Sequence, residues 1–116
     1  MYLESFVLPV PKEHQANSIK GATEMAAIWI ELGALSVTEA QADDVPIGEV
    51  TSFLRSVQTK PDETAVVAFE TFRDHAHRDA VNTAVHAAPC VANVMTLNHV
   101  DERRMIWGGF DVVVFV

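Results

Sequence analysis

The segment 75–79, with the sequence HAHRD, holds the densest group of side chains in this chain that could do chemistry. His75 and Asp79 are four residues apart, so on a helix they would share one face and could offer two metal ligands. Two ligands do not complete a zinc site, and His86 lies about three helical turns further along. We therefore expect an exposed His–Asp pair on a helix, and no bound metal.

His77 falls on the side of the same helix that is expected to face a sheet. A histidine there could act as a general base inside a cavity, with Glu70 or Asp79 holding its tautomer. The alternative is a first-turn histidine whose hydrogen bonds are already satisfied. No nucleophile or oxyanion motif accompanies His77, so the sequence leaves both interpretations open.

Three carboxylates, Glu4, Glu39 and Glu70, occur inside strand-like patterns, and Glu70 interrupts an otherwise apolar one. A buried acid needs a hydrogen-bond donor or a cation beside it, and an ion pair that fixes strand register or dimer orientation is favoured here over acid catalysis. We also expect Glu70 to lie near His77 on the helix-facing side of the sheet, as the polar end of any internal pocket. The cations available to such an acid are Arg55, Arg103 and Arg104.

The glycine pair at 108–109 is no phosphate-binding loop, because no helix follows it and the glycine and lysine spacing is absent. We expect a bulge or a close backbone approach there, and no cofactor. His77 and Glu70 are the candidate catalytic residues. The candidate ligand-binding residues are Trp107, Arg78, Asp79, Glu39 and Arg55.

The elements that must position these residues can be read from the spacing of apolar residues. Period-two patterns predict strands over residues 2–10, 34–44, 64–72 and 103–116, and a short extra strand over 50–54. Helical spacing begins near Lys12 and ends before Gly33, and a second helix is capped by Asp74 and closed by Pro89, with one further helical turn around residues 91–95. The order predicts an α+β, ferredoxin-like βαββαβ fold with an antiparallel sheet.

The last strand is apolar on both faces, with Ile106 and Phe110 on one side and Met105 and Trp107 on the other. A chain of 116 residues, which suits a single domain over 1–116, has enough helix to cover only one face of such a sheet. We therefore expect the other face to meet a second copy of the chain, giving a homodimer.

Composition narrows the possible partners. The chain has 8 basic and 16 acidic residues, and its formal net charge of -8 would repel a phosphate backbone and an anionic lipid surface. We expect neither nucleic acid nor membrane as a partner. The amino terminus has no signal-like segment, no apolar run is long enough to cross a bilayer, and Cys90 is the single cysteine. These features favour the cytoplasm.

Seven segments in order resemble the small bacterial proteins of domain of unknown function 1428. Membership implies the dimeric alpha+beta barrel superfamily, in which two ferredoxin-like subunits pack sheet to sheet, and it implies no established activity. Two stretches depart from the family pattern, at residues 88–90 and 95–103. The matching segments are FVLPVP at 6–11, GAL at 33–35, DD at 43–44, VTSF at 50–53, KPDET at 60–64, AHRDAVN at 76–82 and RMIWGGF at 104–110.

Three functions remain as hypotheses. The first is a homodimer that binds a small apolar or neutral organic molecule between helices and sheet, without metal or nucleotide. The second is a cofactor-independent enzyme, monooxygenase-like or dehydratase/hydrolase-like, with His77 as base. The third is an interaction or stress-response protein without a small ligand. An enclosed cavity on which His77 and an acid converge would favour catalysis, and a filled core would favour the third hypothesis.

Overall fold

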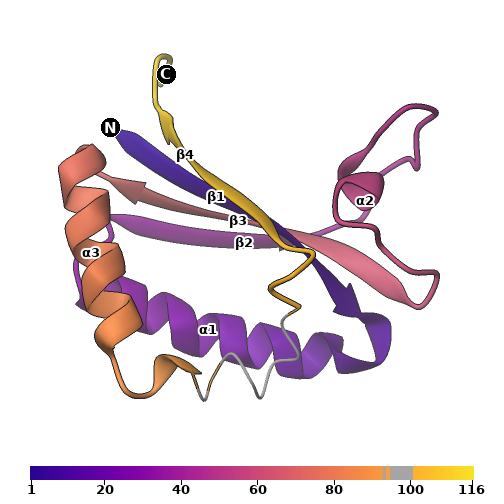
Figure 1. Ribbon diagram of the computed structural model, residues 1–116, viewed down its shortest axis with the longest axis horizontal. Helices are drawn as coiled ribbons and strands as arrows, with labels where there is room; N and C mark the ends of the chain where they lie inside the picture. The colour runs from indigo at the N-terminus through magenta and orange to yellow at the C-terminus, as the bar shows by residue number, and fades with distance from the viewer. Residues whose placement is uncertain (93, 95–100) are drawn as a thin grey trace.

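One antiparallel sheet with strand order β2-β3-β1-β4 forms the centre of the molecule, and two long helices lie on the same side of it (Figure 1). This is the ferredoxin-like βαββαβ arrangement that the sequence predicted. The computed structural model describes residues 1–92, 94 and 101–116. The elements are β1 (Tyr2–Pro11), η1 (Lys12–His14), α1 (Gln15–Glu31), β2 (Ser36–Gln41), α2 (Phe53–Ser56), β3 (Glu63–Phe72), α3 (His75–Ala87) and β4 (Ile106–Asp111).

The register of the strands decides which side chains share the helix-facing side. On the two central strands Glu4 lies opposite Glu70, and Tyr2 lies opposite Phe72. On the β4 side Trp107 pairs with Phe6. Because side chains alternate along a strand, the even-numbered residues of β1 and β3 and the odd-numbered residues of β4 all point toward the helices.

The core lies where α1 and α3 meet the end of β3. Phe72 is fully buried there, and its ring meets that of Trp29 edge to face with centroids 6.3 Å apart. Val81 and Val85 from α3 pack into the same cluster. Truncating a buried phenylalanine to alanine typically costs about 3–5 kcal/mol of unfolding free energy. The packing of Val81 and Val85 in the same cluster as Phe72 therefore holds α3 in place on the sheet.

Both helix signals singled out in the sequence are confirmed. The Asp74 carboxylate accepts a 2.7 Å hydrogen bond from the backbone N–H of His77, which caps α3. At the end of α1, the N–H of Ala34 reaches the Trp29 carbonyl while the N–H of Gly33 reaches Ile30, the pattern of a Schellman motif. Gly33 has φ 123°, a conformation that favours glycine.

The prediction of a strand over residues 50–54 is wrong. Ser52 caps a short helix instead, its hydroxyl accepting a 3.0 Å bond from the backbone N–H of Arg55. Val50 and Phe53 are largely exposed in the projecting arm that carries this helix. A strand there would have no surface against which these side chains could pack, so their strand propensity does not decide the structure. Residues 34–44 form a shorter strand than expected, Ser36–Gln41. Of the turn expected at 91–95, Val91, Ala92 and Val94 are helical and Met95 lies outside the described residues.

The other face of the sheet carries neither α1 nor α3 and is called the helix-free face below. The arm around α2 covers one end of it, where Pro9 and Ala65 are buried, whereas the face is exposed along β4. The C-terminal segment and the arm that carries α2 both project from the sheet on the side away from α1 (Figure 1). The last strand ends at Asp111, earlier than expected, although the N–H of Val112 still bonds to the Met1 carbonyl. Exposed apolar residues of β4 and the C-terminal segment include Ile106, Phe110, Val113, Val114, Phe115 and Val116.

In the described ranges, no helix is long and apolar enough to span a bilayer.

Candidate functional site

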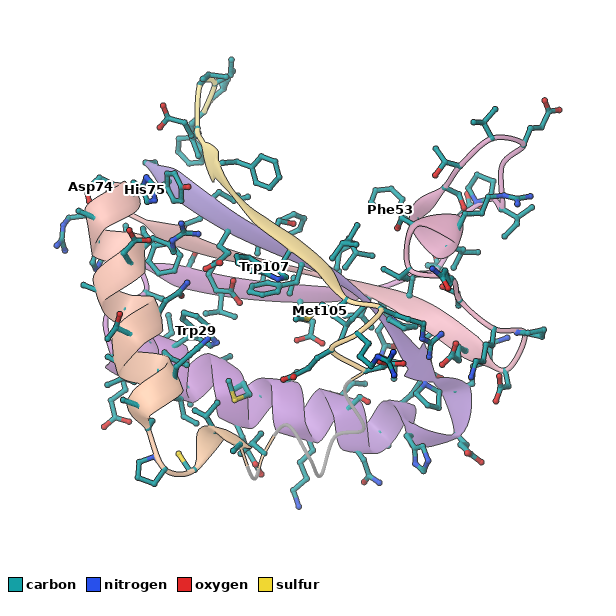
Figure 2. The ribbon with its side chains drawn as sticks, viewed as in Figure 1. Trp29, Phe53, Asp74, His75, Met105 and Trp107 are labelled. Atoms are coloured by element: carbon teal, nitrogen blue, oxygen red, sulfur yellow. The ribbon has the colours of Figure 1, made fainter. Side chains whose placement is uncertain are left out.

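A cavity of about 1090 Å³ separates α1 and α3 from the helix-facing side of the sheet. Figure 2 shows Trp107 and Met105 on the side of the sheet that faces α1, which carries Trp29. The volume is slightly above the usual range of about 300–1,000 Å³ for small-molecule sites, which are mainly apolar with a few placed polar groups. The apolar part of the lining includes Phe6, Leu8, Met25, Trp29, Met105 and Trp107.

Carboxylates from three neighbouring strands line the sheet side of this cavity. Glu4 and Glu70 are opposite one another on β1 and β3, and they are only 1% and 4% exposed. Glu39 on β2 lies opposite Ala68, one step along the same face from Glu70. Because directly opposed side chains sit about 4.5–5.5 Å apart at Cβ, the acids form one electrostatic group.

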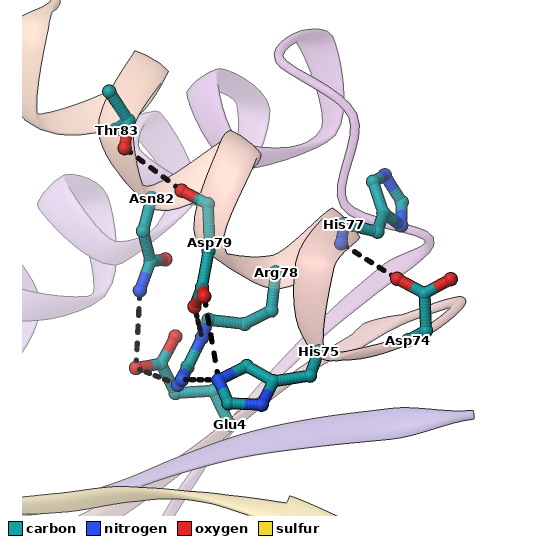
Figure 3. Close-up of polar contacts among 8 residues, drawn as sticks. All are labelled: Glu4, Asp74, His75, His77, Arg78, Asp79, Asn82 and Thr83. Carbon is teal, nitrogen blue, oxygen red and sulfur yellow. Dashed lines mark hydrogen bonds and ion pairs between the residues drawn. The ribbon is translucent and has the colours of Figure 1, made fainter.

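Helix α3 supplies the polar side chains that meet this group (Figure 3). Arg78 Nη1 lies 3.2 Å from Glu4 Oε1, and Asn82 Nδ2 donates to the same oxygen at 3.4 Å. The two residues are four apart, so they lie on the same side of α3. A guanidinium and an amide therefore share one oxygen of Glu4.

Arg78 is held by contacts on several sides. Its Nε donates to Asp79 at 2.8 Å, its guanidinium carbon lies 5.1 Å from the centre of the Tyr2 ring, and that ring stacks on His75. Gly109 lies opposite Glu4, and a Cβ there would lie 2.7 Å from Arg78 Nη1 and also collide with the Tyr2 hydroxyl. The close backbone approach expected at the glycine pair is thus confirmed at Gly109.

Four buried polar atoms around the cavity have no hydrogen-bond partner among the described residues. Glu4 Oε2 and Glu70 Oε2 come from the sheet, Asn82 Oδ1 from α3 and Ser18 Oγ from α1. All four residues belong to the cavity lining. Buried polar groups are nearly always hydrogen-bonded in native proteins. The described part of the chain supplies no partner for these four atoms, so we expect their partners to come from outside it.

The environment of Glu70 changes its acidity. Loss of hydration raises the pKa of the Glu70 carboxyl to about 8, and the negative charges of Glu4 and Glu39 act in the same direction. Partial removal from water also raises the pKa of Glu39. Near neutral pH Glu70 is therefore largely protonated, and it can take up or release a proton when its surroundings change.

The structure brings some of the sequence candidates together and leaves others apart. Glu70, Glu39 and Trp107 line the cavity. His77 is not part of the lining: its Nδ1 accepts a 3.0 Å bond from the backbone N–H of Arg73, and its ring meets Phe72 edge to face. In the described part of the chain, no hydrogen bond joins His77 to Glu70.

The expected cations do not reach Glu70 either. Arg104 forms a bidentate ion pair with Glu63, with both bonds 2.7 Å long, and also donates a hydrogen bond to Asp101. These bonds from Arg104 lower the pKa of Glu63 and of Asp101. Arg55 donates to the carbonyls of residues 47 and 48 on the α2 arm. Arg103 lines the cavity but is exposed. The cation found beside the acids is Arg78, and it pairs with Glu4.

Asn82 and Ser18 are site residues that the sequence analysis missed. Asn82 could have been found from its position one helical turn after Arg78, on the same side of α3. Ser18 carries no comparable signal. The His75–Asp79 pair forms as expected, with Nε2 3.4 Å from Oδ2, and the described residues hold no group of three His, Cys, Asp or Glu side chains placed to bind a metal.

Comparisons with known proteins agree with this fold and leave the chemistry open. The family model described as "Protein of unknown function (DUF1428)" matches residues 1–101. The uncharacterized protein YbaA of Escherichia coli K12 is 31% identical over 113 residues, which is 97% of each chain, and YbaA of Shigella flexneri is equally similar.

Two solved structures share the fold at low sequence identity. One, a dimeric ferredoxin-like protein from an uncultured marine organism, has a TM-score of 0.64 at 15% identity and covers 99% of this chain and 98% of its own. The other, an uncharacterized NIPSNAP domain protein from Burkholderia xenovorans, has a TM-score of 0.63 at 14% identity and covers 100% and 98%. Likeness at this level of identity speaks for the fold and for nothing finer.

Proposed function

The chain belongs to the DUF1428 family of proteins of unknown function, and we propose that it binds a small organic molecule in the cavity between its helices and its sheet. The observation that carries this proposal is the group of unpartnered buried oxygen atoms on Glu4, Glu70 and Asn82 beside the apolar part of the cavity. An apolar body would fill the space beside Trp29 and Trp107, and a polar group would reach Glu4 and Glu70.

The proposal includes a homodimer, formed through the helix-free face of the sheet. Val113, Val114 and Phe115 are each more than three-quarters exposed, and Ile106 and Phe110 continue the same apolar surface. Exposed apolar patches of this kind typically mark a protein interface. The structural neighbour from a marine organism, described as dimeric, adds support. A cytoplasmic setting, suggested by the single cysteine, completes the proposal.

Matched substitutions on α1 test ligand binding directly. Ala22 lines the cavity and Ala27 is exposed on the same helix, so Ala22→Leu fills the site and Ala27→Leu does not. Protein purified from its own host should carry a small molecule in native mass spectrometry, retained in Ala27→Leu and lost in Ala22→Leu. Absence of any bound molecule from wild-type protein and from its denatured extract would contradict the proposal.

A second candidate function is acid–base catalysis on the bound molecule. The observation that favours it is the raised pKa of Glu70, because a carboxylic acid poised near neutral pH can donate and accept a proton. Glu70 rather than His77 would then be the group that exchanges the proton, since Glu70 lines the cavity. Turnover that follows a single ionisation near pH 8 and disappears in Glu70→Gln would support this candidate.

A further inference from the structure

We infer that the molecule bound in the cavity carries a cationic nitrogen group, an amine, an amidine or a guanidinium, on an apolar body. This inference rests on the proposed function and adds the chemical class of the ligand. The cationic group would lie between Glu4 and Glu70, within reach of Asn82. The reasons are the kind of atoms left without partners, the balance of charge, and the shape of the remaining lining.

The unpartnered atoms are mainly acceptors. Glu4 Oε2 is a carboxylate oxygen, and Asn82 Oδ1 is an amide oxygen whose orientation is set by the bond from Asn82 Nδ2 to Glu4 Oε1. Glu70 Oε2 becomes a further acceptor once Glu70 ionises. Strand register places Glu4 and Glu70 directly opposite one another, with α3 bringing Asn82 over them. Several acceptors facing one space call for a ligand that donates several hydrogen bonds.

The charges in the cluster favour a positive ligand. Three carboxylates, those of Glu4, Glu39 and Glu70, face the cavity, whereas Arg78 bonds to only one oxygen of Glu4 and shares its charge with Asp79. A cation between Glu4 and Glu70 would form charge-assisted hydrogen bonds with both. An anion would meet like charge at short range, and the chain's net charge of -8 would oppose its approach.

The rest of the cavity suits an apolar and preferably flat body. Trp29, Trp107, Phe6 and Met25 line it. Aromatic faces attract organic cations as well as apolar groups, so the same lining would stabilise the part of the ligand next to the charge. A small inorganic cation would leave this volume unfilled, which is why an organic cation fits better.

Binding of such a cation should release a proton. Glu4 on β1 lies opposite Glu70, and Glu39 on β2 lies along the same face. From α3, Arg78 bonds to Glu4 and His86 belongs to the lining, whereas α1 contributes no titratable group to the lining. Among the described residues the lining also includes Asp101, Glu102 and Arg103. A cation beside Glu70 favours the ionised carboxyl and so lowers its pKa. Affinity for a permanent cation should therefore rise as the pH increases toward 8.

Three probes of the same shape and different charge test the inference: benzamidine (cation), benzamide (neutral) and benzoate (anion). The measurement is an NMR titration of the full chain that follows the indole N–H signals of Trp29 and Trp107. We expect benzamidine to bind at least about tenfold more tightly than benzamide, and benzoate to leave both signals unmoved. Between pH 6 and pH 8 the affinity for benzamidine should rise by about tenfold or more, while the affinity for benzamide stays constant.

A pair of charge-matched variants locates the effect. Glu70→Gln should lose about tenfold in benzamidine affinity together with its pH dependence, and should keep its affinity for benzamide. Glu24→Gln, on the exposed side of α1 and outside the lining, should behave as wild type. If Glu70→Gln does not fold, the pH series on the wild-type protein decides.

Two negative results have different meanings. Benzamide or benzoate binding as tightly as benzamidine, or benzamidine affinity independent of pH, would overturn the cationic class and leave the cavity as a binding site. Failure of all three probes to move the Trp29 and Trp107 signals at millimolar concentration would overturn the proposed function itself.

Discussion

The two faces of this sheet lack different kinds of partner. The helix-free face exposes apolar side chains from β4 and from the C-terminal segment, whereas the helix-facing side encloses buried oxygen atoms without hydrogen-bond partners in the described part of the chain. Apolar surface can be covered by any complementary surface, because the hydrophobic effect has no preferred direction. Hydrogen bonds require a donor at a defined position. In the proposed function, a second copy covers the first face and a specific ligand supplies the donors for the second.

The largest expected effect comes from placing charge on the helix-free face. The double substitution Val113→Asp and Phe115→Asp should weaken dimerisation by roughly a hundredfold or more, because two carboxylates would have to be desolvated in the interface. Analytical ultracentrifugation at micromolar concentration measures the change. Ile19→Asp, at an exposed apolar position on α1, is the control and should remain dimeric. Wild-type protein that is monomeric at micromolar concentration would contradict the comparison.

The next effect concerns the ion pair under α3. Arg78→Met removes the cation that bonds the buried Glu4 carboxylate, and leaving a buried charge unpaired costs about 3 kcal/mol or more of unfolding free energy. Arg73→Met, an exposed arginine five residues earlier, should change the unfolding free energy by less than about 0.5 kcal/mol. Urea denaturation at one fixed protein concentration checks both. Equal effects of the two substitutions would show that the Arg78–Glu4 contact is not important for stability.

A third prediction uses the acidity of Glu70. Its pKa is raised in the folded protein from 4.5 to about 8, so the folded state holds a proton that the unfolded state has released between these values. The contribution of Glu70 to unfolding free energy should therefore fall as the pH rises across this window, with a slope of about 1.4 kcal/mol per pH unit, and should level off above pH 8. Glu70→Gln should lack this slope. Parallel pH profiles of variant and wild type would contradict the burial of an acid at this position.

The smallest effect is expected at His77. His77→Ala should change benzamidine affinity by less than about twofold, because the ring packs on Phe72 outside the cavity lining, and should lower stability by about 1 kcal/mol through loss of the bond to the Arg73 N–H. His86→Ala, at a residue that lines the cavity, is the positive control for binding. A large loss of binding in His77→Ala alone would restore His77 as a site residue.

The part of the fold that depends on local signals could be predicted from the sequence. Asp74 and Gly33 mark helix ends through short-range hydrogen bonds, and runs of residues that are apolar on both faces define β1 and β3. The strand predicted at 50–54 was wrong because the N-cap at Ser52 overrode weak strand propensity on an exposed arm. The local sequence could not distinguish a capped helix from a strand at this place, because it does not show whether a strand would have a surface to pack against.

The candidate site was only partly predictable, because its geometry depends on register. Glu70 and Trp107 could be singled out, one as an acid in an apolar strand and the other as an aromatic in a strand with two apolar faces. The pairing of Glu4 with Glu70, the approach of Arg78 over Gly109 and the participation of Asn82 depend on distant strands and helices meeting at one place. No local pattern contains this information.

The most direct test of the central claim is a crystal structure of the protein purified from its own host, without added ligand. We predict non-protein electron density between α1 and the sheet, with a nitrogen within about 3 Å of Glu70 Oε2 and Glu4 Oε2. The aromatic or aliphatic part of the molecule should lie against Trp29 and Trp107. Density that shows the cavity closed by the chain's own side chains, with the oxygen atoms of Glu4 and Glu70 bonded to protein donors, would contradict the account.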